Sequence, residues 1–334
     1  MLANRIAKKF KHLSKWARRT GAGAFRLYDR DIPELPLVLD FYGDANSPAL
    51  VSGALYRRPN GKTQTEEELW LKAMQEAIAA ALAIDCAQIF IKRRQRQRGA
   101  DQYEKLSDAA VTRIITENGL RFKVNLSDYL DTGLFPDRRL LRAAIKREAA
   151  GKKALNLFCY TGSYSAAAAA GGAASTCSVD LSNTYLGWAM DNFSLNKIKS
   201  RSAAMRDYWA MHKHKANILV KSDALAFLEK ARQERCAWDI IILDPPAFSN
   251  SKKMSGTLDL RRDYLKLLEL CLGLLNTGGT LWFSANSKRW TKSAQALEAE
   301  LKETFPALKV SDVTKQITDE DFRGRKIPRT FRFL

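Results

Sequence analysis

One stretch, residues 238–250, constrains the fold of this chain more than any other. Its apolar run Ile240–Leu243 leads directly into Asp244-Pro245-Pro246. Consecutive apolar residues rich in isoleucine are typical of a strand covered on both faces in a parallel sheet. The prolines end the strand because each lacks an N–H and has a fixed φ. Ligands of open α/β sheets bind outside the carboxyl ends of strands, so Asp244 and Phe248 are expected at a site, with a rigid acid-capped turn as the alternative.

From residue 128 onward, predicted strands alternate with predicted helices, which favours a doubly wound, Rossmann-like α/β sheet. The expected strands cover 153–158, 175–179, 216–220, 238–243, 280–284, 309–313 and 330–334. The expected helices cover 136–149, 163–170, 183–196, 223–231, 258–275 and 294–303.

The first part of the chain has a different pattern. Apolar residues at three- and four-residue intervals predict a basic amphipathic helix within residues 1–23. Residues 24–126 predict a smaller α+β domain, with strands at 25–28, 37–42, 50–56 and 89–91, a helix opened by a capping box at Thr65 and running to Ala83, and a hairpin around Asn118-Gly119. We therefore expect three parts, 1–23, 24–126 and 127–334.

The net charge of +19, from 55 Lys and Arg against 36 Asp and Glu, indicates a polyanionic partner. A membrane surface is the weaker alternative, because no apolar anchor or spanning segment accompanies the charge. Basic runs on the N-terminal helix and after the strand at 89–91 are candidate RNA contacts, although such runs also form plain solvated surfaces. The RNA-contact candidates are Arg5, Lys8, Lys9, Lys92, Arg93, Arg94, Arg96, Arg98, Lys252 and Lys288.

The five cysteines are scattered and never occur in C-x-x-C spacing. This pattern predicts a reducing, cytoplasmic location and neither a disulfide framework nor a zinc site. Only three histidines are present, so no metal is expected.

Polar groups follow four successive predicted strands in the second half of the chain: 156–162, Asp180, Ser222-Asp223 and Asp244. Asp180 comes 18 residues after Gly162, near the spacing of an acid that binds ribose hydroxyls. Asp223 either receives an adenine amino group or only caps a helix. The turn holds Gly162 alone in place of G-x-G-x-x-G, which disfavours a dinucleotide and a dehydrogenase. S-adenosylmethionine, which has no phosphate, suits this turn better.

The segments 156–163 (NLFCYTGS) and 244–252 (DPPAFSNSK) resemble the bacterial large-subunit ribosomal RNA methyltransferases. The similarity is greatest to the guanine-N7 module of the fused K/L enzymes, and it extends to 128–139 (DYLDTGLFPDRR) and 3–8 (ANRIAK). The resemblance implies a Rossmann-like catalytic domain and an RNA-handling role for the α+β region 24–126. The implied methyl donor is S-adenosylmethionine, and the implied partner is 23S rRNA or a large-subunit assembly intermediate. It also implies that Asp137 and Arg139 enclose the methionine end of the cofactor. Pro136 and Arg138 depart from the apolar residue and the His or Gln expected there.

These arguments define two sets of predicted site residues. The cofactor-binding set is Phe135, Asp137, Arg139, Asn156, Phe158, Tyr160, Thr161, Gly162, Asp180, Leu181, Asp223, Ala224, Asp244 and Pro245. The catalytic set is Asp244, Phe248, Asn250 and Asn286.

The expected reaction is methylation of guanine N7 by in-line attack, without a covalent enzyme intermediate. Cytosine C5 methylation requires a cysteine nucleophile, and neither 284–288 nor the segment beside the prolines contains one. Guanine N7 carries its own lone pair, so Asp244 would orient the base and Phe248 would stack on it. Asn250 and Asn286 are candidate readers of the base edge, or plain turn residues. Methylation of an exocyclic amine and a non-catalytic RNA-binding or assembly role remain alternatives, the latter disfavoured by intact acids at the strand ends.

Overall fold

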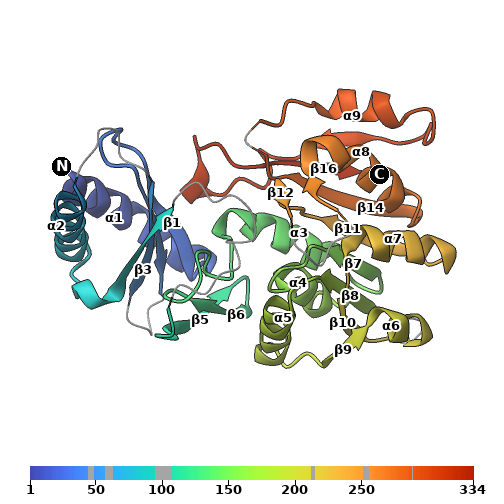
Figure 1. Cartoon of the computed structure of the whole chain (residues 1–334), viewed down its shortest axis with the longest axis horizontal. Helices are drawn as coiled ribbons and strands as arrows, with labels where there is room; N and C mark the ends of the chain where they lie inside the picture. Colours follow the sequence, from blue (N-terminus) through green and yellow to red (C-terminus); the bar gives the residue numbers. More distant parts are fainter. Residues whose placement is uncertain (44–48, 57–62, 95–106, 212–214, 251–255, 288) are drawn as a thin grey trace. The chain divides into compact units, whose positions relative to one another are not determined.

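The computed structural model describes residues 1–43, 49–56, 63–94, 107–211, 215–250, 256–287 and 289–334 (Figure 1). They form two compact units. Unit 1 comprises Met1–Pro136 and Asp319–Arg323, and unit 2 comprises Asp137–Thr318 and Gly324–Leu334. The predicted domain border at 126/127 lies within unit 1, and the RNA-handling role of the first part of the chain stays a prediction.

Unit 1 is built on a four-stranded sheet of β1 (Ala24–Asp29), β2 (Leu37–Tyr42), β3 (Leu50–Tyr56) and β4 (Ile89–Arg94), in that order. The first three strands pair antiparallel, and β4 pairs parallel to β3. Helices α1 (Leu2–Thr20) and α2 (Gln64–Leu82) share one apolar core with this sheet. The predicted strands and both predicted helices are confirmed.

Local signals fix two further features of unit 1. The hairpin of β5 (Thr112–Glu117) and β6 (Leu120–Asn125) turns at Asn118 and Gly119, which have φ angles of 51° and 75°. Positive φ at both positions is the type I′ geometry that Asn-Gly favours. The prediction that the capping box of α2 starts at Thr65 is wrong. Thr63 and Glu66 form the box, because the helix already begins at Gln64.

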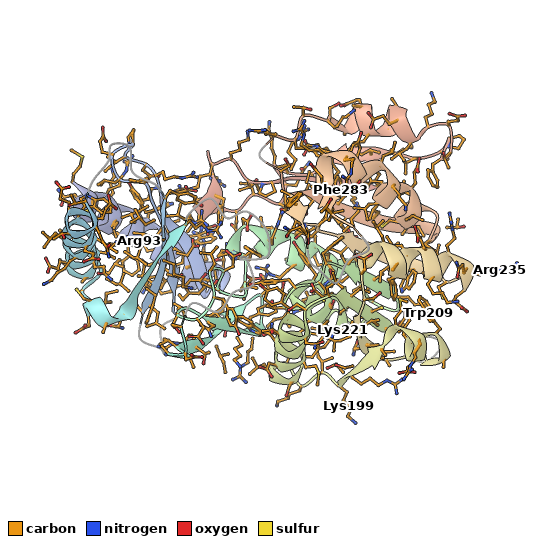
Figure 2. The ribbon with its side chains drawn as sticks, viewed as in Figure 1. Arg93, Lys199, Trp209, Lys221, Arg235 and Phe283 are labelled. Atoms are coloured by element: carbon orange, nitrogen blue, oxygen red, sulfur yellow. The ribbon has the colours of Figure 1, made fainter. Side chains whose placement is uncertain are left out.

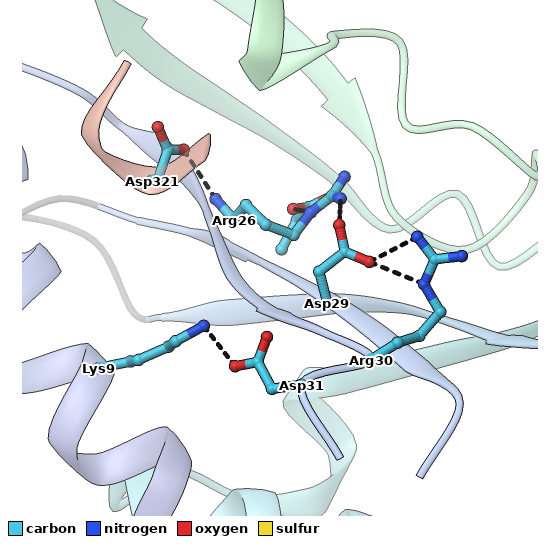
Figure 3. A network of polar contacts seen from close by, with 7 residues as sticks. Lys9, Arg26, Asp29, Arg30, Asp31 and Asp321 are labelled. Atoms are coloured by element: carbon cyan, nitrogen blue, oxygen red, sulfur yellow. Dashed lines mark hydrogen bonds and ion pairs between the residues drawn. The ribbon is translucent and has the colours of Figure 1, made fainter. Parts of the chain in front are cut away.

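Helix α1 is fixed to unit 1 by apolar and ionic contacts. Its buried face includes Ile6 and Trp16, and it ends at Gly21, whose φ of 69° gives a left-handed C-cap. On its polar side, Lys9 donates a hydrogen bond to Asp31, which follows β1 (Figure 3). Arg5 lies 3.6 Å from the same carboxylate.

A short segment from near the C-terminus completes unit 1. It contains the 3₁₀ helix η4 (Glu320–Phe322). The buried carboxylate of Asp321 accepts a 2.9 Å hydrogen bond from the backbone N–H of Arg26 in β1, as Figure 3 shows. The Arg26 guanidinium also lies 5.0 Å from the centre of the Phe322 ring. The sequence pattern did not predict this return of the chain.

Unit 2 is organised around an eight-stranded sheet in the order β15-β16-β14-β11-β7-β8-β10-β9. The pairs from β9 to β14 are parallel, and β16 pairs antiparallel with both β14 and β15. The strands are β7 (Lys153–Leu157), β8 (Ser175–Asp180), β9 (Ser200–Ala204), β10 (Asn217–Lys221), β11 (Trp238–Leu243), β14 (Leu275–Ala285), β15 (Val310–Asp312) and β16 (Arg329–Phe333). The predicted Rossmann-like sheet is confirmed.

Helices cover both faces of this sheet, which explains the apolar run of β11. Ile240 and Ile242 share a core with α3 (Arg139–Glu148) and α4 (Ser163–Ala170). Ile241 and Leu243 point to the other face, where buried Phe283 of β14 also lies (Figure 2). That second core includes residues of α7 (Ala224–Gln233), α8 (Leu260–Leu272) and α9 (Ala294–Leu301). Helix α5 (Asn183–Leu195) packs against β10 through a third, smaller core.

Four elements of unit 2 were not predicted. Strand β9 and helix α6 (Met205–Met211) follow α5. Strand β9 is polar and lies at the sheet edge with no buried residue, so it lacks an apolar signal. The short strands β12 (Phe248–Ser249) and β13 (Leu258–Asp259) form a two-stranded ladder after the prolines. Consequently α8 begins at Leu260, later than the predicted 258. It ends at Leu272, before the predicted 275, because β14 starts at Leu275.

Candidate active site

The carboxyl ends of four parallel strands meet at one edge of the sheet. Leu157 is paired with both Leu243 and Val179, and Val179 is paired with Val220. The loops after β7, β8, β10 and β11 therefore emerge side by side. The sequence prediction that these strand ends share one edge is confirmed.

The loop after β7 has an unusual backbone. Phe158, Tyr160 and Gly162 all have left-handed φ angles, of 54°, 52° and 69°. Such angles are costly for residues other than glycine and occur often at binding sites. A Cβ atom on Gly162 would lie 2.7 Å from the Cβ of Ala189 in α5, so both its φ and its packing require glycine. Buried Asn192 supports the loop by donating a 2.8 Å hydrogen bond to the carbonyl of Thr161.

Asp180 ends β8 beside this loop. Its two carboxylate oxygens accept hydrogen bonds of 2.9 Å from the backbone N–H groups of Tyr160 and Ser182. Burial raises the pKa of Asp180 to about 6, although these backbone donors act in the opposite direction. Each oxygen keeps a further lone pair, so the carboxylate can still accept two hydroxyl groups.

Two other predicted cofactor residues hold clear structural positions. Asp223 caps α7, because its Oδ1 accepts a 3.0 Å hydrogen bond from the backbone N–H of Ala226. Asn156 is buried in β7 and donates to Ser165 at 2.9 Å, while its Oδ1 is buried without a hydrogen-bond partner among the described residues. The capping role of Asp223 is thus observed, and its contact with adenine stays a prediction.

A cluster of donors surrounds Asp244 at the end of β11. Tyr164 donates its hydroxyl to Oδ2 at 2.9 Å, and Asn286 donates its amide to Oδ1 at 2.6 Å. The guanidinium of Arg138 lies 3.4 Å from Oδ1. Asn286 also donates to the carbonyl of Pro245 at 2.8 Å. We call this group the Asp244 cluster: Asp244, Pro245, Tyr164, Asn286 and Arg138.

Arg138 is the most deeply placed charge of the Asp244 cluster, with 3% of its surface exposed. It donates to Asn286 Oδ1 at 2.7 Å and to the hydroxyl of Thr330 at 3.2 Å. Burial lowers the pKa of Arg138, but the charges of Asp244, Tyr164 and Asp137 together outweigh burial, and the net pKa is raised. Arg138 therefore stays charged and pairs with Asp244.

The sequence missed Arg138, Tyr164 and Thr330 as site residues. The only signal was the unexpected arginine at position 138, where the resemblance called for His or Gln. Of the implied acid-and-arginine pair, Arg139 is buried at the start of α3 and Asp137 is partly exposed.

Two of the predicted base-contacting residues, Phe248 and Asn250, lie in and beside β12. Phe248 has 48% of its surface exposed, which is high for a large apolar side chain. Asn250 is partly exposed. Phe135, from the predicted cofactor set, is 44% exposed.

The predicted RNA-contact residues separate into three groups. Lys8 and Arg93 are exposed, and Figure 2 labels Arg93 on β4. Arg5 and Lys9 pair with Asp31, and Arg94 pairs with Asp131. Lys92 is buried and donates to the carbonyl of Tyr129, so its side chain belongs to the packing of unit 1. Outside the described residues lie Arg96, Arg98, Lys252 and Lys288.

A parallel sheet with this loop, an acid after β8 and Asp-Pro-Pro after β11 defines a Rossmann-like methyltransferase. The sequence pattern of the S-adenosylmethionine-dependent methyltransferases matches residues 49–313. A relative in Neisseria meningitidis named ribosomal RNA large subunit methyltransferase K is 45% identical over 98% of this chain and 85% of its own length. A Stutzerimonas stutzeri relative named ribosomal RNA large subunit methyltransferase K/L is 42% identical over 99% of this chain, which spans 41% of that protein.

Solved structures of similar fold also include a methyltransferase. A methyltransferase complexed with SAH superimposes with a TM-score of 0.72 at 24% identity, covering 99% of this chain and 80% of that one. The chain belongs to the S-adenosylmethionine-dependent methyltransferase family, and within it to the group of relatives named K and K/L. The resemblance inferred from the motifs is confirmed, and the cofactor is S-adenosylmethionine. No helix among the described residues is long and apolar enough to cross a membrane.

Proposed function

We propose that this enzyme methylates N7 of a guanine in large-subunit ribosomal RNA, in the cytoplasm. The relatives named K and K/L support ribosomal RNA as the substrate class. The observation that carries the choice of atom is the chemistry of the Asp244 cluster, whose side chains offer donors to a carboxylate and no thiol.

A thiol is what cytosine C5 methylation would need. The side chains that contact Asp244 belong to Tyr164, Asn286 and Arg138. Cys159, in the cofactor loop, is buried, and burial raises the pKa of its thiol well above the ordinary value. A buried neutral thiol is a poor nucleophile, so the site favours a base that reacts through its own lone pair.

S-adenosylmethionine, when bound, would supply the methyl group. The N7 lone pair would bond to the methyl carbon while the carbon–sulfur bond breaks, with its electron pair left on sulfur. No proton leaves the guanine in this step. The negative charge of Asp244 offsets the positive charge that develops on the purine, and the exposed ring of Phe248 stacks on the base.

The proposed contacts with the adenosine part of the cofactor come from the strand ends, and those with its methionine part come from the family resemblance. Asp180 accepts the ribose hydroxyls, Asp223 faces the adenine, and Asp137 with Arg139 encloses the methionine end. The unpartnered acceptor of Asn156 and the left-handed loop 158–162 support a ligand at this edge.

The proposal is tested by the product. Purified protein, S-adenosylmethionine and large-subunit RNA should yield 7-methylguanosine, measured by mass spectrometry of the digested nucleosides. RNA transcribed with 7-deazaguanosine, which has carbon in place of N7, should accept no methyl group. A methylated pyrimidine or exocyclic amine as the main product of the wild-type protein would refute the N7 assignment.

We further propose that RNA docks on one face of α1. Helical periodicity places five cations on that face, all exposed, and within the part of the chain that the structure describes none of them forms an ion pair. At 1.5 Å per residue the face is about 16 Å long, enough to follow several phosphates. We call these residues the basic stripe: Lys8, Lys11, Lys15, Arg18 and Arg19. Arg5 and Lys9, which pair with Asp31, lie outside it.

Substituting Lys8, Lys11 and Lys15 together with alanine should raise the KM for RNA about tenfold and leave kcat nearly unchanged. The dependence of binding on salt should weaken as well, because each lost phosphate contact lowers the log–log slope by about 0.7–0.9. The matched control replaces Lys199, Lys302 and Lys309, three exposed lysines of unit 2. Equal effects of the two triple variants would show that only net charge matters.

A further inference from the structure

The side-chain amide of Asn286 bridges two oxygen atoms at the end of β11. Its Nδ2 lies 2.6 Å from Asp244 Oδ1 and 2.8 Å from the carbonyl oxygen of Pro245. A primary amide has two N–H groups, and each is directed to one of these acceptors. Asn286 therefore takes one acceptor position on each of these two oxygens, and Arg138 is a second donor to Asp244 Oδ1.

Arg138 fixes the orientation of this amide. Its guanidinium donates to Asn286 Oδ1 at 2.7 Å. Because a guanidinium has donors only, the amide oxygen must face Arg138 and the nitrogen must face Asp244 and Pro245. Arg138 is itself held by Thr330, which is fully buried, so the arrangement is rigid.

The same two oxygens are the acceptors that an exocyclic amine would need. An amine that attacks a methyl group keeps hydrogens that must be bonded, and it must release one proton to an acceptor. A ring nitrogen such as N7 has no hydrogen and needs neither. On the base edge that carries N7, guanine has the acceptor O6, whereas adenine has the donor N6 amine.

We propose that Asn286 is a specificity-determining residue: by donating to Asp244 Oδ1 and the Pro245 carbonyl, it competes with an exocyclic amine for these oxygens and so favours a ring nitrogen on a guanine edge. This inference rests on the proposed N7 function. Arg138 is the positioning residue that keeps the amide in place. Asn286 acts through the two oxygens that it covers.

Asn286→Ala tests the proposal, because it uncovers both acceptors. With large-subunit RNA, the ratio of N6-methyladenosine and N2-methylguanosine to 7-methylguanosine should rise by about tenfold, as expected for two hydrogen bonds made available. The transferred amine proton would pass to the uncovered carboxylate of Asp244. On RNA containing 7-deazaguanosine, the variant should form amine products while the wild-type protein forms none.

Asn276→Ala is the matched control. Asn276 lies near the other end of β14 and also donates to an aspartate, Asp239, at 2.7 Å. It should leave the product ratio unchanged. Asn286→Ser, which retains one small donor, should give an intermediate ratio and serves if the alanine variant does not fold.

The outcomes separate the two proposals. If the wild-type protein forms 7-methylguanosine and both Asn286 variants keep its product ratio, the specificity role is overturned. If the wild-type protein itself methylates an amine, the proposed N7 function is refuted, and the specificity role that rests on it is refuted with it. A fall in total activity at an unchanged ratio would reduce Asn286 to a structural residue and also contradict the inference.

Discussion

Asp244→Ala is expected to lower kcat/KM for RNA methylation by about a hundredfold to a thousandfold, measured at saturating cofactor. We propose that this carboxylate lies beside the target base, and its loss would remove the charge that offsets the positive purine. It also removes the acceptor shared by Tyr164 and Asn286. The base would then be neither oriented nor stabilised as it reacts.

The same substitution should cost stability. Arg138 is buried, and without Asp244 its charge loses its paired carboxylate. Breaking one side of such a pair costs about 3 kcal/mol or more of the free energy of unfolding. Thermal unfolding checks this expectation.

Asp239→Ala is the control for both effects. Asp239 lies near the start of the same strand, β11, and accepts from the backbone of Lys153 at 2.7 Å. Its loss removes a hydrogen-bonded aspartate far along the strand from the candidate site. An Asp244→Ala variant that kept activity within tenfold of the Asp239→Ala variant would contradict the role given to Asp244.

Gly162→Ala should destabilise unit 2 by about 3 kcal/mol and weaken cofactor binding. The estimate combines the cost of a left-handed φ for alanine with the cost of overpacking. The added Cβ would lie 2.7 Å from the Cβ of Ala189, so α4 and α5 would have to separate. The cofactor loop lies at this junction, and its displacement should raise the Kd for S-adenosylmethionine, measured by isothermal titration.

Gly187→Ala is a matched control in the neighbouring helix. Gly187 lies within α5, and a Cβ there would meet no atom within 4 Å. Alanine should therefore stabilise the helix by roughly 0.5–1 kcal/mol. Similar melting temperatures for the two variants would refute the packing argument at Gly162.

Much of the sheet could be predicted because its signals are local. The apolar run of β11 and the prolines after it identify a buried strand and its end within a dozen residues. Asp180 and Asp244 could be placed at one edge because parallel strands align their carboxyl ends. Edge strand β9 was missed since it buries no side chain and so has no pattern to recognise.

The chemistry around Asp244 could not be predicted in the same way. Its partners Tyr164, Arg138 and Asn286 lie 80, 106 and 42 residues away along the chain. No periodicity or spacing links such positions, because only the folded sheet brings them together. The pairing of Lys9 with Asp31 likewise could not be predicted from the sequence, and the contact of Lys9 with RNA stays a prediction.

The return of Asp319–Arg323 to unit 1 limits how this protein can be recombined. The unit is discontinuous in sequence, so a gene segment encoding only residues 1–136 would lack the carboxylate that accepts from the Arg26 backbone and the ring beneath its guanidinium. Exchange between related proteins would preserve these contacts only if both segments moved together. A segment that keeps unit 1 whole must therefore also carry the stretch of unit 2 that lies between its two parts.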